Sequence, residues 1–528
     1  MKKSVSLLIA LSLICGMNVY AQETMDAYKY SQSDLHGTAR FSSMAGAFGA
    51  LGGDISSMTT NPAGIGIYRS SEVVATLNLS TMKAESNWSG SKADQSKTKF
   101  NFDNIAYVGY FPTGNYSGIK GWNFGFAYNR VKNFARNYKV SGTQRYSLSD
   151  YIAEITNDLS VNNSGYTGVN LWLTDNYNPF DAGYNPLSVA GYSGGLIGSE
   201  HPSQKGGFYN PFSDNTGFWP IQRANLEVTE RGAIDQYDFA VATNISDILF
   251  LGATFVLTDI DYTYRSIYNE DFGSGDYSEL YNARNTEGNA YSFNLGAIVR
   301  PIDYLRLGVA YNSPTWYKLT DYNYVEAASK IKDDNISVYS NAAPNDYKLR
   351  TGDRWIFSAA GILGQYGLIN VDYELKNYKT MKLSTSDGLE YEANDRIKQD
   401  FGTSGTLRIG TEAKITSQFA IRAGGAWMNS PVKDHVKDAT REIFVSGTIP
   451  HYTVDRGTNY YTVGFGYRFT PQFYVDLACI YKEYKEDVYT FSNIYYEDKG
   501  DIKTAVASVP SSMKTKTTRL ALTFGYKF

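Results

Sequence analysis

Histidine is the side chain best suited to proton transfer near neutral pH, and this chain has few. Its four histidines are His36, His201, His435 and His451. A hydrolase built on a membrane barrel would need a Ser or Asp beside one of them. Asp434 and Asp438 lie next to His435 in the sequence, but neighbours in so charged a stretch are usually solvated. Uptake of haem also has little support, because the chain has so few histidines. We therefore expect no catalytic residue, no metal and no cofactor, and a protein that is not an enzyme.

Ten further charged residues lie opposite bulky apolar residues in stretches where the two kinds alternate. They are Asp238, Arg306, Asp372, Glu374, Arg408, Glu412, Arg422, Arg468, Asp476 and Arg519. In the strands of a closed barrel they would point into the interior, where an unpaired charge is costly. We expect them to pair with one another and with Arg40 or Asp54 near the N-terminus. An ion-conducting lining is the alternative, but a folded plug would block it.

The elements that would position these side chains follow a secretion signal. Two lysines precede the apolar stretch 5–14, and small residues lead up to Ala21, so residues 1–21 are predicted to be a signal peptide. A lipoprotein signal ending at Cys15 is the alternative, but the residue before it is bulky. With cleavage after Ala21 only Cys479 remains, and no intrachain disulfide can form.

Composition narrows the class of the mature chain. No run of about 18 apolar residues follows the signal, which excludes helical membrane spans. The mean hydropathy of −0.36 would suit a soluble protein, yet the chain has 45 Tyr and 48 Gly. Outer-membrane barrels place aromatic residues in girdles and turn only alternate residues towards lipid. A net charge of −4 without a basic cluster argues against a nucleic-acid partner. A large secreted β-sandwich is the alternative, and the alternation of side chains decides between the two.

The last ten residues show this alternation most clearly. One face of 519–528 carries Leu, Leu, Phe, Tyr and Phe, and the other carries Arg, Ala, Thr, Gly and Lys. A wall between lipid and lumen requires such a pair of faces. The terminal Phe528 resembles the signal by which the barrel-assembly machinery recognises outer-membrane proteins, so that machinery is an expected partner.

The same period of two recurs upstream and predicts fourteen antiparallel strands. They cover residues 67–80, 100–111, 119–131, 233–243, 249–265, 287–300, 305–313, 353–363, 366–379, 403–415, 418–429, 458–469, 473–487 and 516–528. The connections alternate between long and short, as in a barrel with both termini in the periplasm. The long connections are 81–99, 132–232, 266–286, 314–352, 380–402, 430–457 and 488–515. The fold class is therefore all-β, a 14-stranded transmembrane β-barrel over residues 67–528.

One connection, residues 132–232, is too long to be structureless in a compact fold. Residues 149–158 are typical of a short helix with Ser149 or Asp150 at its N-cap. Aromatic residues then recur among Asn, Gly and Pro, at Trp172, Phe180, Phe208, Phe212, Phe218 and Trp219. Either they form the small core of a surface cap, or they line a groove that captures a ligand.

Residues 22–66, between the signal and the first strand, combine many small residues with a few bulky apolar ones. Such a segment can fold inside a narrow lumen, whereas a disordered leader would not carry this apolar load. Asn61-Pro62-Ala63-Gly64 is typical of a turn, in which Pro62 fixes φ and Gly64 permits a positive φ. We therefore predict that residues 22–66 form a hatch inside the lumen.

The run Gly46-Ala47-Phe48-Gly49-Ala50, followed by Asn61-Pro62-Ala63-Gly64, resembles the hatch of FadL/TodX-type transporters. Weaker similarities continue at 305–314, 420–431 and 467–470, while the long connection 132–232 has no counterpart. Members of that family are 14-stranded barrels that carry long-chain fatty acids or aromatic hydrocarbons across the outer membrane. The style of the sequence resembles the members from Bacteroidota.

The resemblance implies passive uptake by capture between loops, rearrangement of the hatch and lateral exit through the wall. In the family the exit lies at a kink of the third strand, where Gly125 is the expected bend in this chain. An ordinary barrel glycine is the alternative. The hatch residues expected to bind ligand are Phe41, Phe48, Leu51, Ile55 and Met58, with Asn61, Pro62, Ala63 and Gly64 as the hatch motif.

The expected protein is a monomer in the outer membrane of a Gram-negative bacterium. Its expected partners are a hydrophobic small molecule and the surrounding lipid and lipopolysaccharide. A structural or adhesive barrel without transport is the alternative, although such a barrel would not need an apolar hatch.

Overall fold

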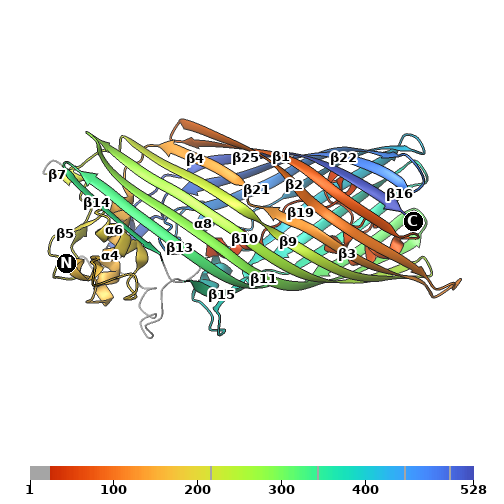
Figure 1. The fold of residues 1–528 in the computed structure, drawn as a ribbon, viewed down its shortest axis with the longest axis horizontal. Coiled ribbons are helices and arrows are strands. Elements are labelled where there is room, and N and C mark those ends of the chain that lie inside the picture. The colour runs from red at the N-terminus through yellow and green to blue at the C-terminus, as the bar shows by residue number, and fades with distance from the viewer. Residues whose placement is uncertain (1–23, 215–216, 342–343, 445–446, 499–500) are drawn as a thin grey trace.

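The structure, a computed structural model, describes residues 24–214, 217–341, 344–444, 447–498 and 501–528, and the predicted signal peptide lies outside them. A closed barrel of fourteen antiparallel strands dominates the fold (Figure 1). Each strand pairs with the next around the ring, and β25 pairs with β1, which closes it. The predicted number and arrangement of strands are confirmed. The ring consists of β1 (Glu72–Trp88), β2 (Ser91–Pro112), β3 (Ile119–Asn133), β9 (Arg223–Ile245), β10 (Leu249–Gly273), β11 (Asp276–Ile302), β12 (Leu305–Asn312), β16 (Arg354–Leu363), β17 (Gly367–Asn377), β19 (Thr403–Lys414), β20 (Phe419–Met428), β21 (Tyr452–Arg468), β22 (Phe473–Tyr489) and β25 (Ser511–Lys527).

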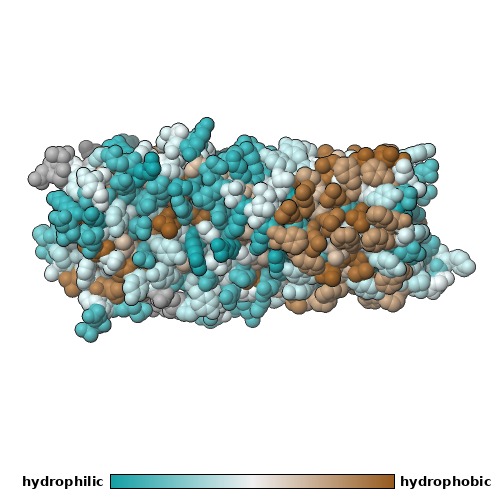
Figure 2. Space-filling model, turned by 45° about the horizontal axis from the view of Figure 1, so that its top comes forward, coloured by the Kyte–Doolittle hydropathy of each residue, from teal (hydrophilic) through white to brown (hydrophobic). Residues whose placement is uncertain are grey.

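Alternating side chains make part of the outer wall apolar. On β25, Leu520, Phe524 and Tyr526 are exposed, whereas Ala521 and Thr523 between them are buried. Exposed large apolar residues recur in the same way on the other strands, and Figure 2 shows them as an apolar belt. This is the pattern that a lipid-facing wall requires. Among the described residues, no helix is long and apolar enough to cross a membrane.

The two ends of the barrel differ in their connections. One end, which we term the turn end, carries connections of two to six residues. It also holds both ends of the ring, where Ser71 and Phe528 exchange backbone hydrogen bonds of 3.1 and 3.0 Å. The long connections lie at the opposite end, the loop end (Figure 1). The belt lies towards the turn end, and the wall beyond it is polar (Figure 2). The predicted alternation of long and short connections holds for five of the seven loop-end connections and fails for the other two.

Several strands extend further towards the loop end than predicted. β1 and β2 are joined by only two residues, 89–90, and β10 and β11 by residues 274–275. The loops predicted at 81–99 and 266–286 are therefore wrong. The prediction followed bulky apolar faces, which these strand ends lack because they lie beyond the belt.

The predicted connection 132–232 is shortened in the same way, because β4 (Arg136–Gly142) pairs with the early part of β9. Its helix α4 (Leu148–Asn162) starts earlier than expected, with Ser147 as the N-cap and Asp150 completing a capping box. Phe212 stacks on Phe272 of β10, with ring centroids 4.1 Å apart. The connection thus packs a core of its own against the loop-end strands, as the cap alternative predicted.

Further helices and strands complete the loop end. They are α5 (Gly168–Leu171), α6 (Pro186–Ser193), β5 (Gly198–Ser199), β6 (Phe208–Tyr209), β7 (Ser213–Asp214), β8 (Gly217–Phe218), β13 (Trp316–Ile331), β14 (Asp334–Asn341), β15 (Asn345–Arg350), η2 (Tyr378–Thr380), β18 (Lys382–Thr385), α7 (Ala393–Asp400), α8 (Asp434–Lys437), β23 (Ile494–Asp498) and β24 (Asp501–Val506).

Residues 24–71, which we term the luminal segment, run inside the barrel. They form α1 (Thr24–Ser31), α2 (Ala39–Ser43), α3 (Ser57–Thr60) and the 3-10 helix η1 (Pro62–Ile67). The first strand therefore begins at Glu72 and not at residue 67. Almost every side chain between residues 38 and 66 is buried, and the segment fills the lumen at the level of the belt.

Candidate functional site

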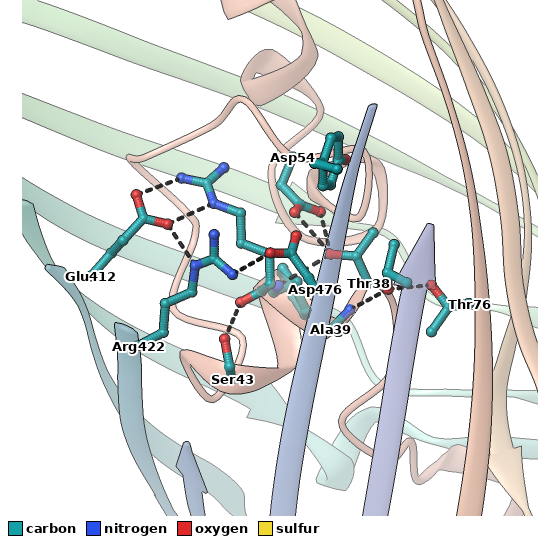
Figure 3. Close-up of polar contacts among 12 residues, drawn as sticks. Thr38, Ala39, Ser43, Asp54, Thr76, Glu412, Arg422 and Asp476 are labelled. Carbon is teal, nitrogen blue, oxygen red and sulfur yellow. Dashed lines mark hydrogen bonds and ion pairs between the residues drawn. The ribbon is translucent and has the colours of Figure 1, made fainter. Parts of the chain in front are cut away.

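Ion pairs attach the luminal segment to the wall (Figure 3). Arg40 of α2 pairs with Glu412 of β19 at an N–O distance of 3.0 Å. Arg422 of β20 pairs with the same Glu412 and with Asp476 of β22, both at 2.6 Å. The Glu412 side chain is only 5% exposed, so its charge depends on these two partners. The predicted pairing of interior charges with Arg40 is confirmed.

Other interior carboxylates hold the backbone of the luminal segment instead of pairing with a cation. Asp372 of β17 accepts from the N–H groups of Phe48 and Gly49 at 2.9 and 3.0 Å. Within the segment itself, Asp54 accepts from the hydroxyl of Thr38 at 2.8 Å and from the N–H of Ser56 at 3.0 Å. Of the two partners that the prediction allowed, Arg40 or Asp54, the described residues show an ion pair to the wall for Arg40. Backbone donors carry no signature in the sequence, which is why these roles could not be foreseen. The hydrogen bonds to Asp372 hold the turn at Phe48 and Gly49 against β17.

Wall glycines allow this close approach. A Cβ at Gly464 would lie 2.4 Å from the Cβ of Ser43, and one at Gly252 would lie 2.4 Å from the carbonyl carbon of Pro62. Any larger side chain at these positions would displace the segment. Wall glycines with similarly short distances to the segment are Gly296, Gly308, Gly410 and Gly424.

The Asn61-Pro62-Ala63-Gly64 motif lies at the start of η1. The Asn61 side chain accepts from the N–H of Ala63 at 3.2 Å and donates to the carbonyl oxygen of Gly49 at 2.6 Å. Gly64 does not use a positive φ, contrary to the expectation. It must be small for another reason, since a Cβ there would lie 2.7 Å from the side chain of Ser57. The motif therefore ties two turns of the luminal segment together.

The five hatch residues expected to bind ligand are all buried against the wall or one another. Phe41, Phe48 and Leu51 form a cluster with Met44 and Leu368, and Ile55 and Met58 belong to a second cluster with wall residues of β1, β2, β3 and β9. Leu51 also lines a pocket at the turn end. Their ligand-binding role remains a prediction.

A cavity of about 290 Å³, the loop-end cavity, lies between the luminal segment and the loop end. Eleven cationic side chains, seven carboxylates and eight tyrosines line it. Two of the cations are satisfied by carbonyl oxygens: Lys132 donates to Lys29 at 2.6 Å, and Lys376 donates to Ser31. Sequence reasoning missed these lysines, because one lies in the predicted long loop and neither stands out by spacing.

The loop-end cavity reaches the wall where β2 and β3 part. Their pairing runs from Pro112–Gly121 to Asn104–Asn129 and ends there. Beyond this point Lys99 and Asp103 of β2 and Arg130 of β3 line the cavity, and β3 carries a bulge between Arg130 and Lys132. The pairing passes through Gly125 without a change of register, and a Cβ there would lie 2.6 Å from the side chain of Met58. Gly125 thus leaves the space that Met58 fills.

The histidines do not assemble a site. His435 contacts Asp400 at 3.1 Å. His451 contacts Tyr264, which is 187 residues away in the sequence. Burial is the main cause that lowers the pKa of His451 to about 3, so its ring is neutral. In the described part of the chain, no three His, Cys, Asp or Glu residues lie close enough to hold a metal ion.

A closed antiparallel barrel with an apolar belt and an occupied lumen defines a β-barrel protein of the outer membrane. Residues 253–528 match the model of the family described as outer membrane protein transport protein (OMPP1/FadL/TodX). The chain belongs to this family, and the resemblance seen in the sequence is confirmed. A comparison with curated protein sequences finds no match.

Solved structures share the fold. A FadL homologue of Pseudomonas aeruginosa superimposes with a TM-score of 0.50 at 13% identity, covering 94% of this chain and 99% of its own. The toluene transporter TodX of P. putida gives 0.50 at 12% identity over 94% and 99% of the two chains. The toluene transporter TbuX of Ralstonia pickettii gives 0.50 at 11% identity, with the same coverage.

Proposed function

We propose that this outer-membrane protein takes up hydrophobic small molecules by diffusion, with the luminal segment as its hatch. The observation that carries the proposal is a lumen filled by the luminal segment, with a cavity of about 290 Å³ between that segment and the loop end. The turn end, which holds Ser71 and Phe528 at the two ends of the ring, would face the periplasm, and the loop end would face outwards. The polar wall beyond the belt would then extend through the lipopolysaccharide layer. The folded connection between β3 and β9, which we term the cap, would cover the loop end of the barrel.

The loop-end cavity favours long-chain fatty acids over neutral aromatic hydrocarbons. Its tyrosines offer apolar faces to a chain, while Lys132 and Lys376 donate to carbonyl oxygens that a carboxylate could replace with a stronger, charge-assisted partner. A neutral hydrocarbon would use only the apolar faces of the tyrosines. The predicted ligand residues Phe41, Phe48, Leu51, Ile55 and Met58 would become accessible when the hatch rearranges.

Exit from the cavity is proposed to be lateral, at the place where β2 and β3 part. Asn104 and Asn129 form the last pair before the two strands part. Gly125 lies further towards the turn end, and withdrawal of Met58 would leave it without its filling neighbour. The wall could bend there more easily than at a residue with a side chain. The third strand is therefore the proposed exit, with Gly125 as its bend.

Uptake by a Gram-negative host without its own fatty-acid transporter tests the substrate. Cells producing the protein should accumulate labelled oleate faster than control cells. Lys132→Met and Lys376→Met should each reduce oleate uptake several-fold while leaving toluene entry unchanged. Equal oleate uptake by the variants and the parent protein would refute the role of these lysines. No uptake of either compound by the parent would favour a structural or adhesive barrel.

Deletion of residues 22–58 tests the hatch. The barrel should still form, as judged by its heat-modifiable mobility in gels, because the ring closes through strands alone. Entry of a hydrophobic fluorescent probe should change. Identical entry in a folded deletion variant would show that the luminal segment does not gate the lumen.

A further inference from the structure

A second pocket lies on the other side of the luminal segment, at the turn end. Its volume is about 240 Å³. The Leu51-Gly52-Gly53 turn of the luminal segment forms one wall, and strands β12, β16, β17 and β19 form the others. The lining consists of Arg40, Leu51, Gly52, Gly53, Arg306, Ile362, Gly364, Gly367, Leu368, Glu412 and Lys414. We term it the turn-end pocket.

Arg306 is the unusual residue of the turn-end pocket. It donates to the carbonyl oxygen of Leu51 through Nη1, while its Nε is buried and has no hydrogen-bond partner among the described residues. Within the same residues it forms no ion pair, and the charged side chains that act on it, Arg40, Arg69 and Arg300, are all cations. The Arg306 side chain is partly buried, and a guanidinium withdrawn from water without an acidic partner is costly. A bound anion would balance the positive charge around Arg306.

The rest of the lining shows which anion would fit. Glu412, the only carboxylate of the lining, is already held by Arg40 and Arg422. Lys414 adds another positive charge at the rim. Leu51, Ile362 and Leu368 form the apolar part of the pocket lining. A liquid water molecule occupies about 30 Å³, so the pocket has the volume of about eight water molecules, which is enough for a small aromatic acid.

We propose that the turn-end pocket binds a small carboxylate with an apolar body. Its carboxylate would accept hydrogen bonds from the free side of the Arg306 guanidinium, and its body would lie against Leu51 and Leu368. A guanidinium presents parallel N–H groups that match a carboxylate. The same arginine and Arg40, which donates to the carbonyl of Gly53 at 2.9 Å, both hold the turn of the luminal segment. The bound anion would therefore brace the luminal segment from the side opposite the loop-end cavity.

Binding of 4-fluorobenzoate to the full-length protein in a non-ionic detergent, followed by fluorine NMR, tests this site. We expect saturable binding, and at least tenfold weaker binding of the neutral 4-fluorobenzamide. Arg306→Gln should weaken benzoate binding by about 10-fold to 100-fold, the range for one charge-assisted contact. Arg306→Lys should lie between the two, because it keeps the charge and loses the fork.

Two variants serve as matched controls. Arg300→Gln removes an arginine of the same end that contacts Asp303 and does not line the pocket, and it should weaken benzoate binding far less than Arg306→Gln does. Lys376→Met removes a cation of the loop-end cavity and should also leave binding unchanged. Binding that survives in a folded Arg306→Gln protein would overturn the proposal. An equal loss in Arg300→Gln, or a loss confined to Lys376→Met, would also overturn it, by assigning the effect to general charge or to the other cavity. None of these results depends on whether the protein transports anything.

Discussion

Glu412→Gln is the most direct perturbation of the link between the luminal segment and the wall. The carboxylate is shared by Arg40 and Arg422, and its side chain is 5% exposed. Glutamine keeps its shape but leaves Arg40 without an ion pair, whereas Arg422 retains Asp476. Removing one partner of a buried pair costs about 3–5 kcal/mol. The Arg40 side chain is 21% exposed, so we expect the lower value, about 3 kcal/mol.

Hydrogen exchange of peptides within residues 38–60 measures this loss, because the segment can open without unfolding the barrel. A change of about 3 kcal/mol corresponds to roughly 100-fold faster exchange. Peptides of β10 should not change. Glu85→Gln is the control, since Glu85 pairs with Lys516 where both side chains are 35% exposed, and such pairs contribute little. Exchange within threefold of the parent protein in residues 38–60 would refute the reasoning. So would an equal increase in β10, which would indicate a weaker barrel.

Three further outcomes are expected. Gly464→Val should destabilise the protein by about 1–3 kcal/mol, because its Cβ would lie 2.4 Å from that of Ser43. Thermal unfolding should separate it from Gly361→Val, where a Cβ has one contact at 3.4 Å, and equal midpoints would contradict this account. Burial is the main cause that raises the pKa of Glu270, which caps α4, to about 7. Its carboxyl holds a proton more tightly when the cap is docked, so docking should weaken as pH rises from about 4.5 to 7. Exchange of α4 at several pH values should show this slope, and its persistence in Glu270→Gln would exclude the assignment. Removal of Phe528 should reduce the folded fraction seen in gels several-fold, since its backbone closes the ring with Ser71; an unchanged folded fraction would argue against that role.

The strands could be predicted because alternation is local. In residues 519–528, the type of each side chain indicates whether it faces lipid or lumen. The same alternation along the chain predicts the fourteen strands and their order. The rule fails where lipid no longer selects one face. The extensions at 81–99 and 266–286 are strands without an apolar face, and only their partners in the sheet reveal them. Ser147, the true cap of α4, was missed by two residues for the ordinary reason that several nearby residues can cap.

The sequence by itself determined the class of protein, the number of strands and the presence of a compact segment of small and apolar residues before them. Only the tertiary structure decided what that segment touches. Arg40 and Glu412 are 372 residues apart, and the donors that meet Asp372 are backbone groups. The loop-end cavity likewise lies between strands from different sides of the ring, and Arg306, which has no acidic partner among the described residues, lies beside the Leu51 turn. Closure of the ring brings these groups together, and a pattern that repeats every two residues carries no information about distances across it.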